Sequence, residues 1–181
     1  MPEVAPGRFL DPDTVVTHFH IKPGETVADF GAGVGYFVPA LAAAIGSEGK
    51  LFACEIQQEL VQKLGDIERG RDWATVTPVW CDLEAPHGSK LPDSSVDVGI
   101  LINTLFMFED KAAAIQEILR VVRPGGKIFV VDWTESFAGL GPAPEMVVDE
   151  AAAVALFESA GITPTGTYPT GDHHYGVVFR R

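Results

Sequence analysis

A glycine-rich turn followed at a distance by an acidic residue is the segment of this sequence best suited to chemistry. The turn contains Gly31, Gly33 and Gly35 and directly follows an apolar run, and Glu55 lies 20 residues beyond its last glycine. Glycine allows the backbone to approach a ligand closely. A carboxylate at such a distance can accept hydrogen bonds from ribose hydroxyls and repels a 2′-phosphate. The turn alone also fits a merely tight bend, and Glu55 shifts the balance toward an adenosine-containing ligand.

Two ligand classes fit a glycine-rich turn, and the residues around it separate them. Dinucleotide-binding oxidoreductases use the spacing G-x-G-x-x-G, with a helix that opens on a pyrophosphate. In this chain the bulky Tyr36 follows Gly35, and Asp29 places a negative charge two residues before Gly31. That carboxylate repels a pyrophosphate and attracts an ammonium group. An amino acid joined to an adenosine therefore fits Asp29 and Glu55 better, and a nicotinamide-dependent oxidoreductase is kept as the alternative.

Length and composition describe an ordinary globular chain of one domain. The chain has 181 residues, of which 46% are hydrophobic and 21% charged, and its mean hydropathy is +0.16. This length is enough to bury a sizeable core. The formal net charge of −12 disfavours a surface that tracks nucleic-acid phosphates. It favours small or neutral partners instead.

Cysteine usage and the N-terminal sequence bear on the compartment. Only Cys54 and Cys81 are present, and their separation fits reduced packing residues better than a metal or redox motif. Residues 1–7 lack the basic and apolar regions of a secretory signal, and no apolar run approaches the roughly 18 residues that a membrane span needs. We expect a cytoplasmic protein with no integral membrane segment and no metal site.

Apolar runs alternate with helix-like stretches along the chain, which is typical of a mostly parallel sheet covered by helices on both faces. Residues 1–25 are expected to form an N-terminal lid or helical segment. The stretch 83–95 is rich in turn formers, so we expect a short helix there or none. The strands that we predict span residues 26–30, 50–56, 75–80, 96–102 and 127–133, with a terminal hairpin at 163–168 and 175–180. The predicted helices span residues 36–45, 57–68, 110–122 and 149–160.

At these motifs the chain resembles class I S-adenosylmethionine-dependent methyltransferases, and the resemblance runs along nearly its whole length. Residues 27–37 look like the family's first motif, and Glu55 looks like its ribose-binding acid. Residues 81–83 resemble the segment that reads the adenine, 101–104 the fourth-strand motif, and 119–127 the turn into strand five. The resemblance implies a single Rossmann-like α/β domain over 1–181. Its sheet would be doubly wound, mostly parallel and seven-stranded, with helices on both faces and an antiparallel last strand.

The resemblance also implies S-adenosyl-L-methionine as the cofactor and gives roles to single residues. Asp29 would help to place the methionine part, Glu55 would bind the ribose, and Asp82 with the next backbone amide would read the adenine. Because these residues follow parallel strands, they gather at the carboxyl edge of the sheet. The cofactor-binding residues that we predict are Asp29, Gly31, Ala32, Gly33, Gly35, Tyr36, Glu55, Ile56, Asp82, Leu83 and Asn103.

Catalytic residues are harder to predict, because the methyl group comes already activated on a sulfonium and the protein's main task is positioning. We predict catalytic roles for Asn103, at the end of a strand, and His174, in the last hairpin. His174 could take a proton from a hydroxyl acceptor near neutral pH. Trp133 fits either an acceptor pocket or packing, and His18 and His20 are expected to be lid or packing residues.

Within this superfamily the best likeness is to the small ubiquinone- and menaquinone-biosynthesis-like methyltransferases, including the opening residues 8–12. The likeness implies methyl transfer to a small-molecule acceptor, of which a quinone is one option. Two cysteines argue against arsenite methylation, which needs several. A non-catalytic cofactor-binding module stays open, because the chain is near the minimal size of the fold. A homodimer also stays open, because a second subunit could cover the substrate.

Overall fold

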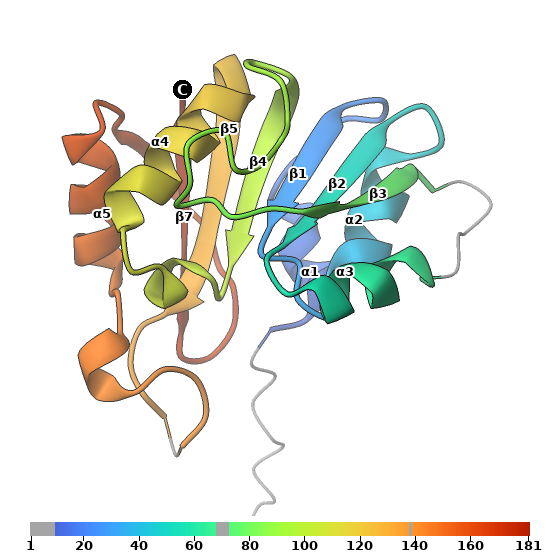
Figure 1. Ribbon diagram of the computed structural model, residues 1–181. Coiled ribbons are helices and arrows are strands. Elements are labelled where there is room, and N and C mark those ends of the chain that lie inside the picture. Colours follow the sequence, from blue (N-terminus) through green and yellow to red (C-terminus); the bar gives the residue numbers. More distant parts are fainter. Residues whose placement is uncertain (1–9, 68–72, 138) are drawn as a thin grey trace, which may run out of the picture.

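The chain forms one seven-stranded sheet with helices on both of its faces (Figure 1). The computed structural model describes residues 10–67, 73–137 and 139–181. The strands lie in the order β3-β2-β1-β4-β5-β7-β6. Their bounds are β1 Thr26–Phe30, β2 Lys50–Glu55, β3 Thr75–Trp80, β4 Val96–Ile102, β5 Val122–Trp133, β6 Pro164–Thr167 and β7 His174–Arg180.

Strand direction follows the sequence prediction. The five strands β3, β2, β1, β4 and β5 pair in parallel, whereas β7 pairs antiparallel with both β5 and β6. The order reverses between β1 and β4, and in open α/β sheets ligands bind at the carboxyl ends of the strands at such a point. The doubly wound sheet with an antiparallel last strand is confirmed, and it directs attention to the carboxyl ends of β1 and β4.

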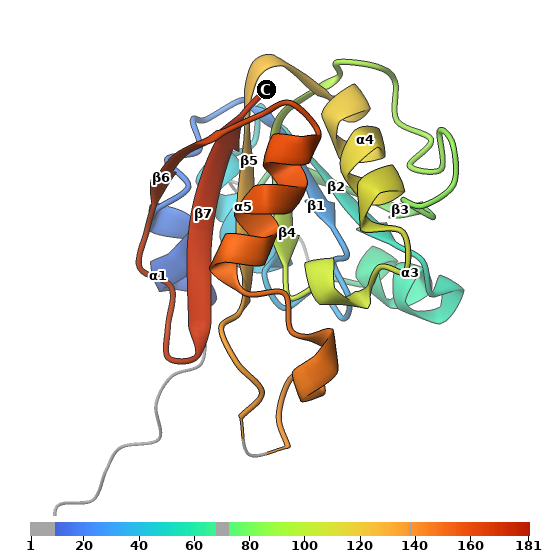
Figure 2. The same ribbon diagram turned by 90° about the vertical axis from the view of Figure 1, so that its left-hand side faces the viewer.

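The helices divide between the two faces of the sheet. The five α-helices are α1 Pro12–Thr17, α2 Val38–Ile45, α3 Gln58–Gly65, α4 Lys111–Val121 and α5 Glu150–Ser159, and two short 3₁₀ turns are η1 Leu105–Met107 and η2 Pro144–Met146. Figures 1 and 2 show α4 and α5 together on one side, with α1, α2 and α3 on the other. Among the described residues, no helix combines the length and hydrophobicity needed to cross a bilayer.

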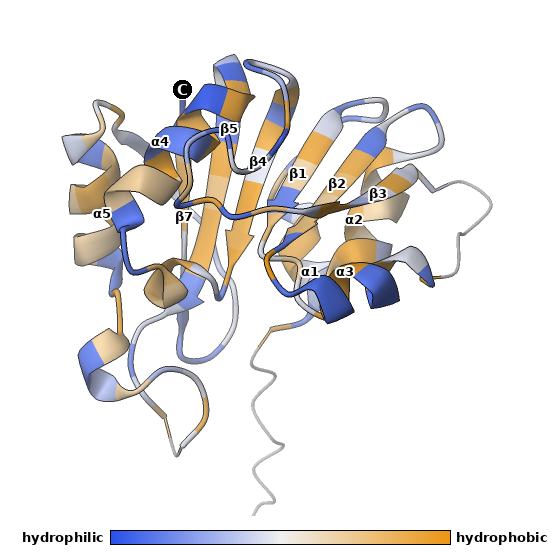
Figure 3. Cartoon of the chain, in the orientation of Figure 1, coloured by the Kyte–Doolittle hydropathy of each residue, from blue (hydrophilic) through white to orange (hydrophobic). Residues whose placement is uncertain are grey.

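Each face of the sheet has its own apolar core. One core packs α4 and α5 against the sheet, and there the Phe157 and Phe179 rings stack with centroids 4.2 Å apart. The other core packs α1 and α2 against the sheet, with Phe19 against Phe129 at 4.7 Å. Figure 3 shows the central strands as largely hydrophobic. Strands buried on both faces are continuous apolar runs in the sequence. The positions of these strands could therefore be predicted from the sequence.

The N-terminal segment is helical only in part. Within the predicted range 1–25, α1 covers Pro12–Thr17, and residues 1–9 lie outside the described part of the chain. Val15 and Val16 are buried, and the Tyr36 hydroxyl donates to the carbonyl of Leu10 at 3.4 Å. The segment thus packs near the glycine-rich turn, and its role as a lid stays a prediction.

Some element boundaries depart from the sequence prediction for local reasons. Helix α2 begins at Val38 rather than at residue 36, because Gly35 at φ +83° keeps the chain in a turn. Strand β5 begins at Val122 rather than at residue 127, because Val122 pairs with Val96 ahead of an irregularity in the ladder. Helix α3 ends at Gly65, before its predicted end at residue 68, which lies outside the described residues.

Two helices begin at aspartates that accept a backbone hydrogen bond. The Asp110 side chain accepts from Ala113 N at 2.9 Å, and that of Asp149 accepts from Ala152 N at 2.8 Å. These bonds satisfy amide groups that the first turn of a helix leaves free. Helix α5 packs Phe157 into one of the apolar cores. Loss of its cap should therefore destabilise both the helix and this packing.

Replacing Asp149 with alanine should therefore lower the free energy of unfolding by about 1 kcal/mol. Urea unfolding followed by circular dichroism measures the change. Asp149→Asn is the matched control, because asparagine caps helices about as well as aspartate. Equal losses in both variants would show that the cap is not the source of the stability.

Candidate active site

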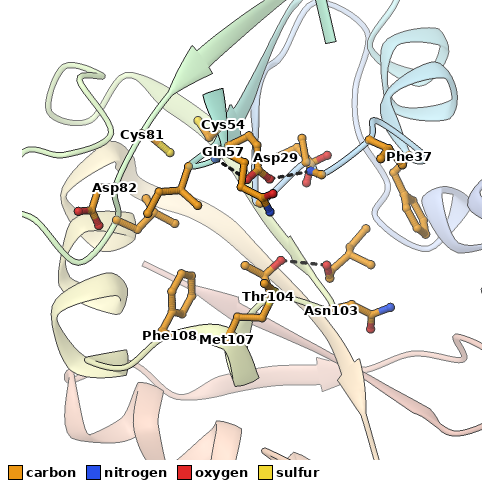
Figure 4. A pocket seen from close by; sticks show the side chains of 18 of the residues that line it. Asp29, Phe37, Cys54, Gln57, Cys81, Asp82, Asn103, Thr104, Met107 and Phe108 are labelled. Carbon is orange, nitrogen blue, oxygen red and sulfur yellow. Dashed lines mark hydrogen bonds between the residues drawn. The ribbon is translucent and has the colours of Figure 1, made fainter. Parts of the chain in front are cut away.

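A cavity of about 390 Å³ opens at the carboxyl ends of β1, β2 and β4. Figure 4 shows Asp82 at one end and Phe37 with Asn103 at the other, while Asp29 and Gln57 lie across from Thr104 and Met107. The lining consists of Asp29, Gly31, Ala32, Gly33, Val34, Tyr36, Phe37, Cys54, Glu55, Ile56, Gln57, Cys81, Asp82, Leu83, Glu84, Ile102, Asn103, Thr104, Met107 and Phe108. The cavity is elongated and suits a ligand with chemically different ends.

The glycine-rich turn is held tightly between β2 and the segment after β4. The amides of Gly31 and Ala32 both donate to the Cys54 carbonyl at 2.9 Å. Gly31 has φ +97°, and a Cβ atom there would lie 2.5 Å from Thr104. Only glycine accepts both this φ and this close approach without strain. The turn therefore has a fixed shape that exposes backbone atoms to the cavity.

Glu55 joins the turn to the neighbouring strand end. One carboxylate oxygen accepts from Gly33 N at 3.0 Å, and the other accepts from Gln57 N at 2.9 Å. The side chain is buried yet lines the cavity. Each carboxylate oxygen has a further lone pair, so that Glu55 can hold the turn and still accept hydrogen bonds from the hydroxyls of a ligand.

Asp29 is the most strongly perturbed acid of the cavity. It is the penultimate residue of β1, is only 3% exposed and lines the cavity. Burial, with a smaller contribution from the charge of Glu55, raises its pKa to about 7. Burial disfavours the charged form of a carboxyl group, and a second carboxylate nearby adds to the effect. A ligand that brings a positive charge would act in the opposite direction and lower the pKa of Asp29.

Asn103 combines an unusual backbone with an unsatisfied side chain. Its φ is +54°, a left-handed conformation, and its backbone N–H donates to the Val131 carbonyl oxygen at 2.8 Å. Its side-chain Oδ1 is buried without a hydrogen-bond partner. Strained residues with unsatisfied polar atoms cluster at functional sites. Asn103 lines the cavity and carries a buried polar atom that the described residues leave without a partner.

The wall formed by Met107 and Phe108 depends on Asp132. This buried carboxylate accepts from Leu105 N at 2.9 Å and from Trp133 N at 2.8 Å. It thereby fixes the first residue of η1, which leads directly to Met107 and Phe108 in the lining. Burial raises the pKa of Asp132 to about 6, although its backbone hydrogen bonds act in the opposite direction.

Most of the predicted cofactor-binding residues line this one cavity. Gly35 is the exception, because a Cβ atom there would lie 2.5 Å from Ile67 Cδ1 and 2.8 Å from Leu64 Cδ2. Its φ of +83° and this contact give it a packing role against α3. The two residues at the rim, Tyr36 and Ile56, are 62% and 54% exposed.

His174 does not line the cavity. It begins β7, and its ring centroid lies 4.2 Å from that of Trp133. Its Nδ1 is 2.9 Å from the Asp172 carbonyl oxygen, and its Nε2 is buried without a hydrogen-bond partner. Burial lowers the pKa of His174. The structure thus places one of the two predicted catalytic residues, Asn103, at the cavity and the other beside Trp133.

Several lining residues were not among those predicted from the sequence. Met107 and Phe108 are of residue types whose commoner use is core packing, so their type alone did not indicate a binding site. Phe37 and Gln57 follow predicted site residues directly, and this adjacency was a usable signal. Cys54 and Cys81, predicted to be separate packing residues, are both buried and free. A hydrogen bond between their side chains raises the pKa of Cys54, a contact that strand pairing alone creates.

The charge of the cavity is its most selective property. Within the described residues, the lining holds the carboxyl groups of Asp29, Glu55, Asp82 and Glu84 but no lysine, arginine or histidine. Such a lining attracts cations and repels a pyrophosphate. S-adenosylmethionine carries a sulfonium, an ammonium group and ribose hydroxyls. The donor and acceptor groups present, including the free Oδ1 of Asn103, fit that cofactor.

The fold and the site define a methyltransferase of the Rossmann-like class. Residues 28–130, more than half of the chain, match the family model described as a methyltransferase domain. The chain therefore belongs to this methyltransferase family. A SAM-dependent methyltransferase from Aquifex aeolicus is similar, with a TM-score of 0.82 and 28% identity over 94% of this chain and 89% of that one.

Two further similarities set the limits of this assignment. The ubiquinone/menaquinone biosynthesis C-methyltransferase UbiE of Cupriavidus pinatubonensis is 31% identical over 129 residues, which are 71% of this chain and 51% of that protein. The chain thus spans about half the length of the curated relatives it matches. The [4+2]-cyclase SpnF has a TM-score of 0.74 at 16% identity, covering 94% of this chain and 79% of that one. That likeness concerns the fold alone.

These findings confirm the methyltransferase family predicted from the sequence and its likeness to the UbiE group. They give no support to the nicotinamide-dependent oxidoreductase or to the non-catalytic module.

Two glycines of the turn should respond differently to replacement by alanine. Gly35→Ala should lower the free energy of unfolding by about 2 kcal/mol, through a strained φ and the clash with Ile67 and Leu64. Gly33→Ala should cost about 1 kcal/mol, because only its φ of +56° is strained and no atom lies within 4 Å of the added Cβ. Since Gly33 lines the cavity, its variant should lose affinity for S-adenosylmethionine at nearly native stability. Urea unfolding and calorimetry separate the two effects, and equal stability losses would contradict the difference.

Asp29→Asn should stabilise the empty protein at pH 8. The pKa of Asp29 is higher in the folded chain than its ordinary value of 3.8, so that the folded state binds more protons between about pH 4 and 7. The ionised carboxyl then opposes folding above pH 7, by up to about 4 kcal/mol.

The gain in the variant should shrink as the pH falls from 7 to 4, where wild-type Asp29 is protonated. Denaturant unfolding across this range measures it, with Asp66→Asn, an exposed position outside the cavity, as the control. A variant less stable than wild type at pH 8 would refute the pKa assignment.

Proposed function

We propose that this protein transfers the methyl group of S-adenosylmethionine to a small apolar acceptor. The observation that carries the proposal is the cavity itself, where the described residues supply four carboxyl groups and no basic side chain around a glycine-rich turn. This charge suits a cofactor that carries a sulfonium and an ammonium group, and it opposes a dinucleotide. Family membership supports the same activity.

We infer the following roles for the lining residues. Asp29 attracts the ammonium group of the methionine part, and Glu55 accepts hydrogen bonds from the ribose hydroxyls. Asp82 and the Leu83 amide read the adenine at the other end of the cavity. The fixed turn of Gly31, Ala32 and Gly33, with Tyr36 and Ile56 at the rim, shapes the space between these ends.

The bound cofactor would supply an activated carbon, and the protein contributes mainly by positioning. Holding two reactants at attack distance can lower the activation free energy by roughly 7–11 kcal/mol. Asn103 is our choice for the acceptor side, since its buried Oδ1 has no partner. His174 lies outside the lining, so we do not place it at the reacting atoms. The described lining thus contains no histidine that could act as a general base. This favours an acceptor that is acidic enough to lose its proton without one, or that transfers its proton to water.

The rim of the cavity supports an apolar acceptor. Val34, Tyr36 and Met107 are 69%, 62% and 57% exposed, and all three line the cavity. Exposed apolar side chains gathered at an opening mark a binding surface. The UbiE relatives are named for ubiquinone and menaquinone biosynthesis, and we propose that phenols and quinols are the first acceptors to test.

The remaining expectations on partners and location are also proposals. A net charge of −12 opposes binding to nucleic-acid phosphates. Two free, buried thiols fit the reducing cytoplasm. We keep a homodimer as the assembly to test by light scattering.

Calorimetry should show saturable binding of S-adenosylmethionine and S-adenosylhomocysteine, and none of NADH. Asp29→Ala should weaken binding of both by about tenfold or more, because it removes a charge-assisted interaction. Asp66→Ala, on the exposed end of α3, is the control that should bind like wild type. With binding established, formation of S-adenosylhomocysteine in the presence of quinols and phenols tests transfer. Binding of NADH in place of both adenosyl compounds would overturn the proposed function.

A further inference from the structure

A second cavity of about 560 Å³ lies on the other half of the sheet and shares no residue with the first. Its lining residues come from β5, β6 and β7 and from the segment after α1. Figure 2 shows these strands and α1 at one edge of the sheet. Phe129 and Val178 form its floor, between neighbouring strands. Neither the family match nor the proposed function gives this cavity a role.

Two permanent cations face each other across the strands of this cavity. Lys127 of β5 and Arg180 of β7 are direct partners in the antiparallel register, and both line the cavity. Like charges directly opposite each other destabilise a sheet. Neither side chain forms an ion pair with a carboxylate in the described part of the chain. The register therefore places two like charges opposite each other at this position.

The charge of this cavity is opposite to that of the whole chain. The described lining contains Lys127, Arg180, His18 and His20 and no aspartate or glutamate, although the chain has 25 acidic residues and a net charge of −12. Surface lysines of acidic proteins usually lie among carboxylates, which screen them. A pocket that concentrates cations against the average charge is arranged to attract an anion.

The remaining groups in the cavity describe the rest of a ligand. Phe129 is an aromatic floor, and the Lys127 ammonium lies 5.9 Å from its ring centroid. The Tyr168 ring packs edge-on against Phe129 at 5.7 Å, and His18 stacks on Tyr168 at 6.2 Å. Thr167 adds an exposed hydroxyl at the edge. These groups suit a ring joined to an oxyanion.

We propose that this cavity is a binding site for an oxyanion carried on a ring, of the kind that a phosphate monoester provides. Lys127 and Arg180 bind the oxyanion together, which removes the repulsion between them. The partly exposed rings of His18 and Tyr168 contact the ligand's ring. Because no lining residue is shared with the first cavity, the ligand binds there whether or not the active site is filled.

The test uses the full chain at low ionic strength and compares thermal unfolding with calorimetric binding. Phenyl phosphate, inorganic phosphate and benzoate are the probes, each matched by sodium chloride of equal ionic strength. Wild type should bind phenyl phosphate at least about fivefold more tightly than inorganic phosphate, because the ring contacts His18 and Tyr168. Benzoate reports whether a carboxylate serves as well as a phosphate.

Two variants separate an anion site from two solvated side chains. Lys127→Met should raise the melting temperature in the absence of anion, because it removes the repulsion of Arg180, and should weaken phenyl phosphate binding by about tenfold. Arg180→Gln should act in the same direction on both readouts. Lys50→Met, at the exposed start of β2, is the matched control and should change neither.

The outcomes are distinct. A melting temperature that rises equally with every probe and with sodium chloride, in wild type and variants alike, would overturn the proposal, because only screening would be at work. Phosphate binding of equal strength in wild type and Lys127→Met would overturn it as well. Binding that disappears only in Lys127→Met and Arg180→Gln, with S-adenosylmethionine binding unchanged, would establish a second site.

Discussion

The arrangement of the active site depends on the Glu55 carboxylate, which accepts one hydrogen bond from the turn after β1 and another from the residue that precedes α3. A single side chain thereby joins two strand ends and a helix start at the edge where the strand order reverses. The other constraints follow from this contact. The turn lies close enough to Thr104 to require glycine at position 31, and Asp29 is brought near the charge of Glu55. Hydrogen bonds to charged groups are among the stronger ones in proteins, so that one carboxylate can fix several backbone segments.

The linings of the two cavities carry charges of opposite sign. At one edge, the buried Asp29 carboxyl opposes folding above about pH 7 when the cavity is empty, and such costs at functional sites are offset by packing elsewhere. Two separate apolar cores supply that packing, one on each face of the sheet. On the far half of the sheet the sign is reversed by Lys127 and Arg180. A chain with an overall negative charge thus presents one cavity suited to cations and one suited to anions.

Much of the fold could be predicted from the sequence, because strands buried on both faces are continuous apolar runs and parallel strands place their carboxyl ends together. That rule predicted that Asp29, Glu55 and Asp82, chosen from motif spacing and family resemblance, would gather at one edge, and all three line the cavity. Other features depend on contacts between distant segments. Met107 and Phe108 reach the cavity only because Asp132, on another strand, holds η1 in place. The lack of space at Gly35 comes from α3. His174 pairs with Trp133 at the carboxyl end of β5, but its ring lies against the Trp133 ring and does not line the cavity.

Strand β7 follows all other strands in the sequence, yet it lies between β5 and β6 in the sheet. During synthesis on the ribosome, β5 would therefore emerge long before its neighbour exists, with one row of backbone groups unpaired. Unpaired strand edges in incomplete chains are prone to associate with other chains. Helix α5 and its loop are made in this interval, and α5 contacts β7. The nascent chain thus passes through a stage at which protection of the β5 edge by a chaperone, or rapid release of residues 174–180, decides between native pairing and aggregation.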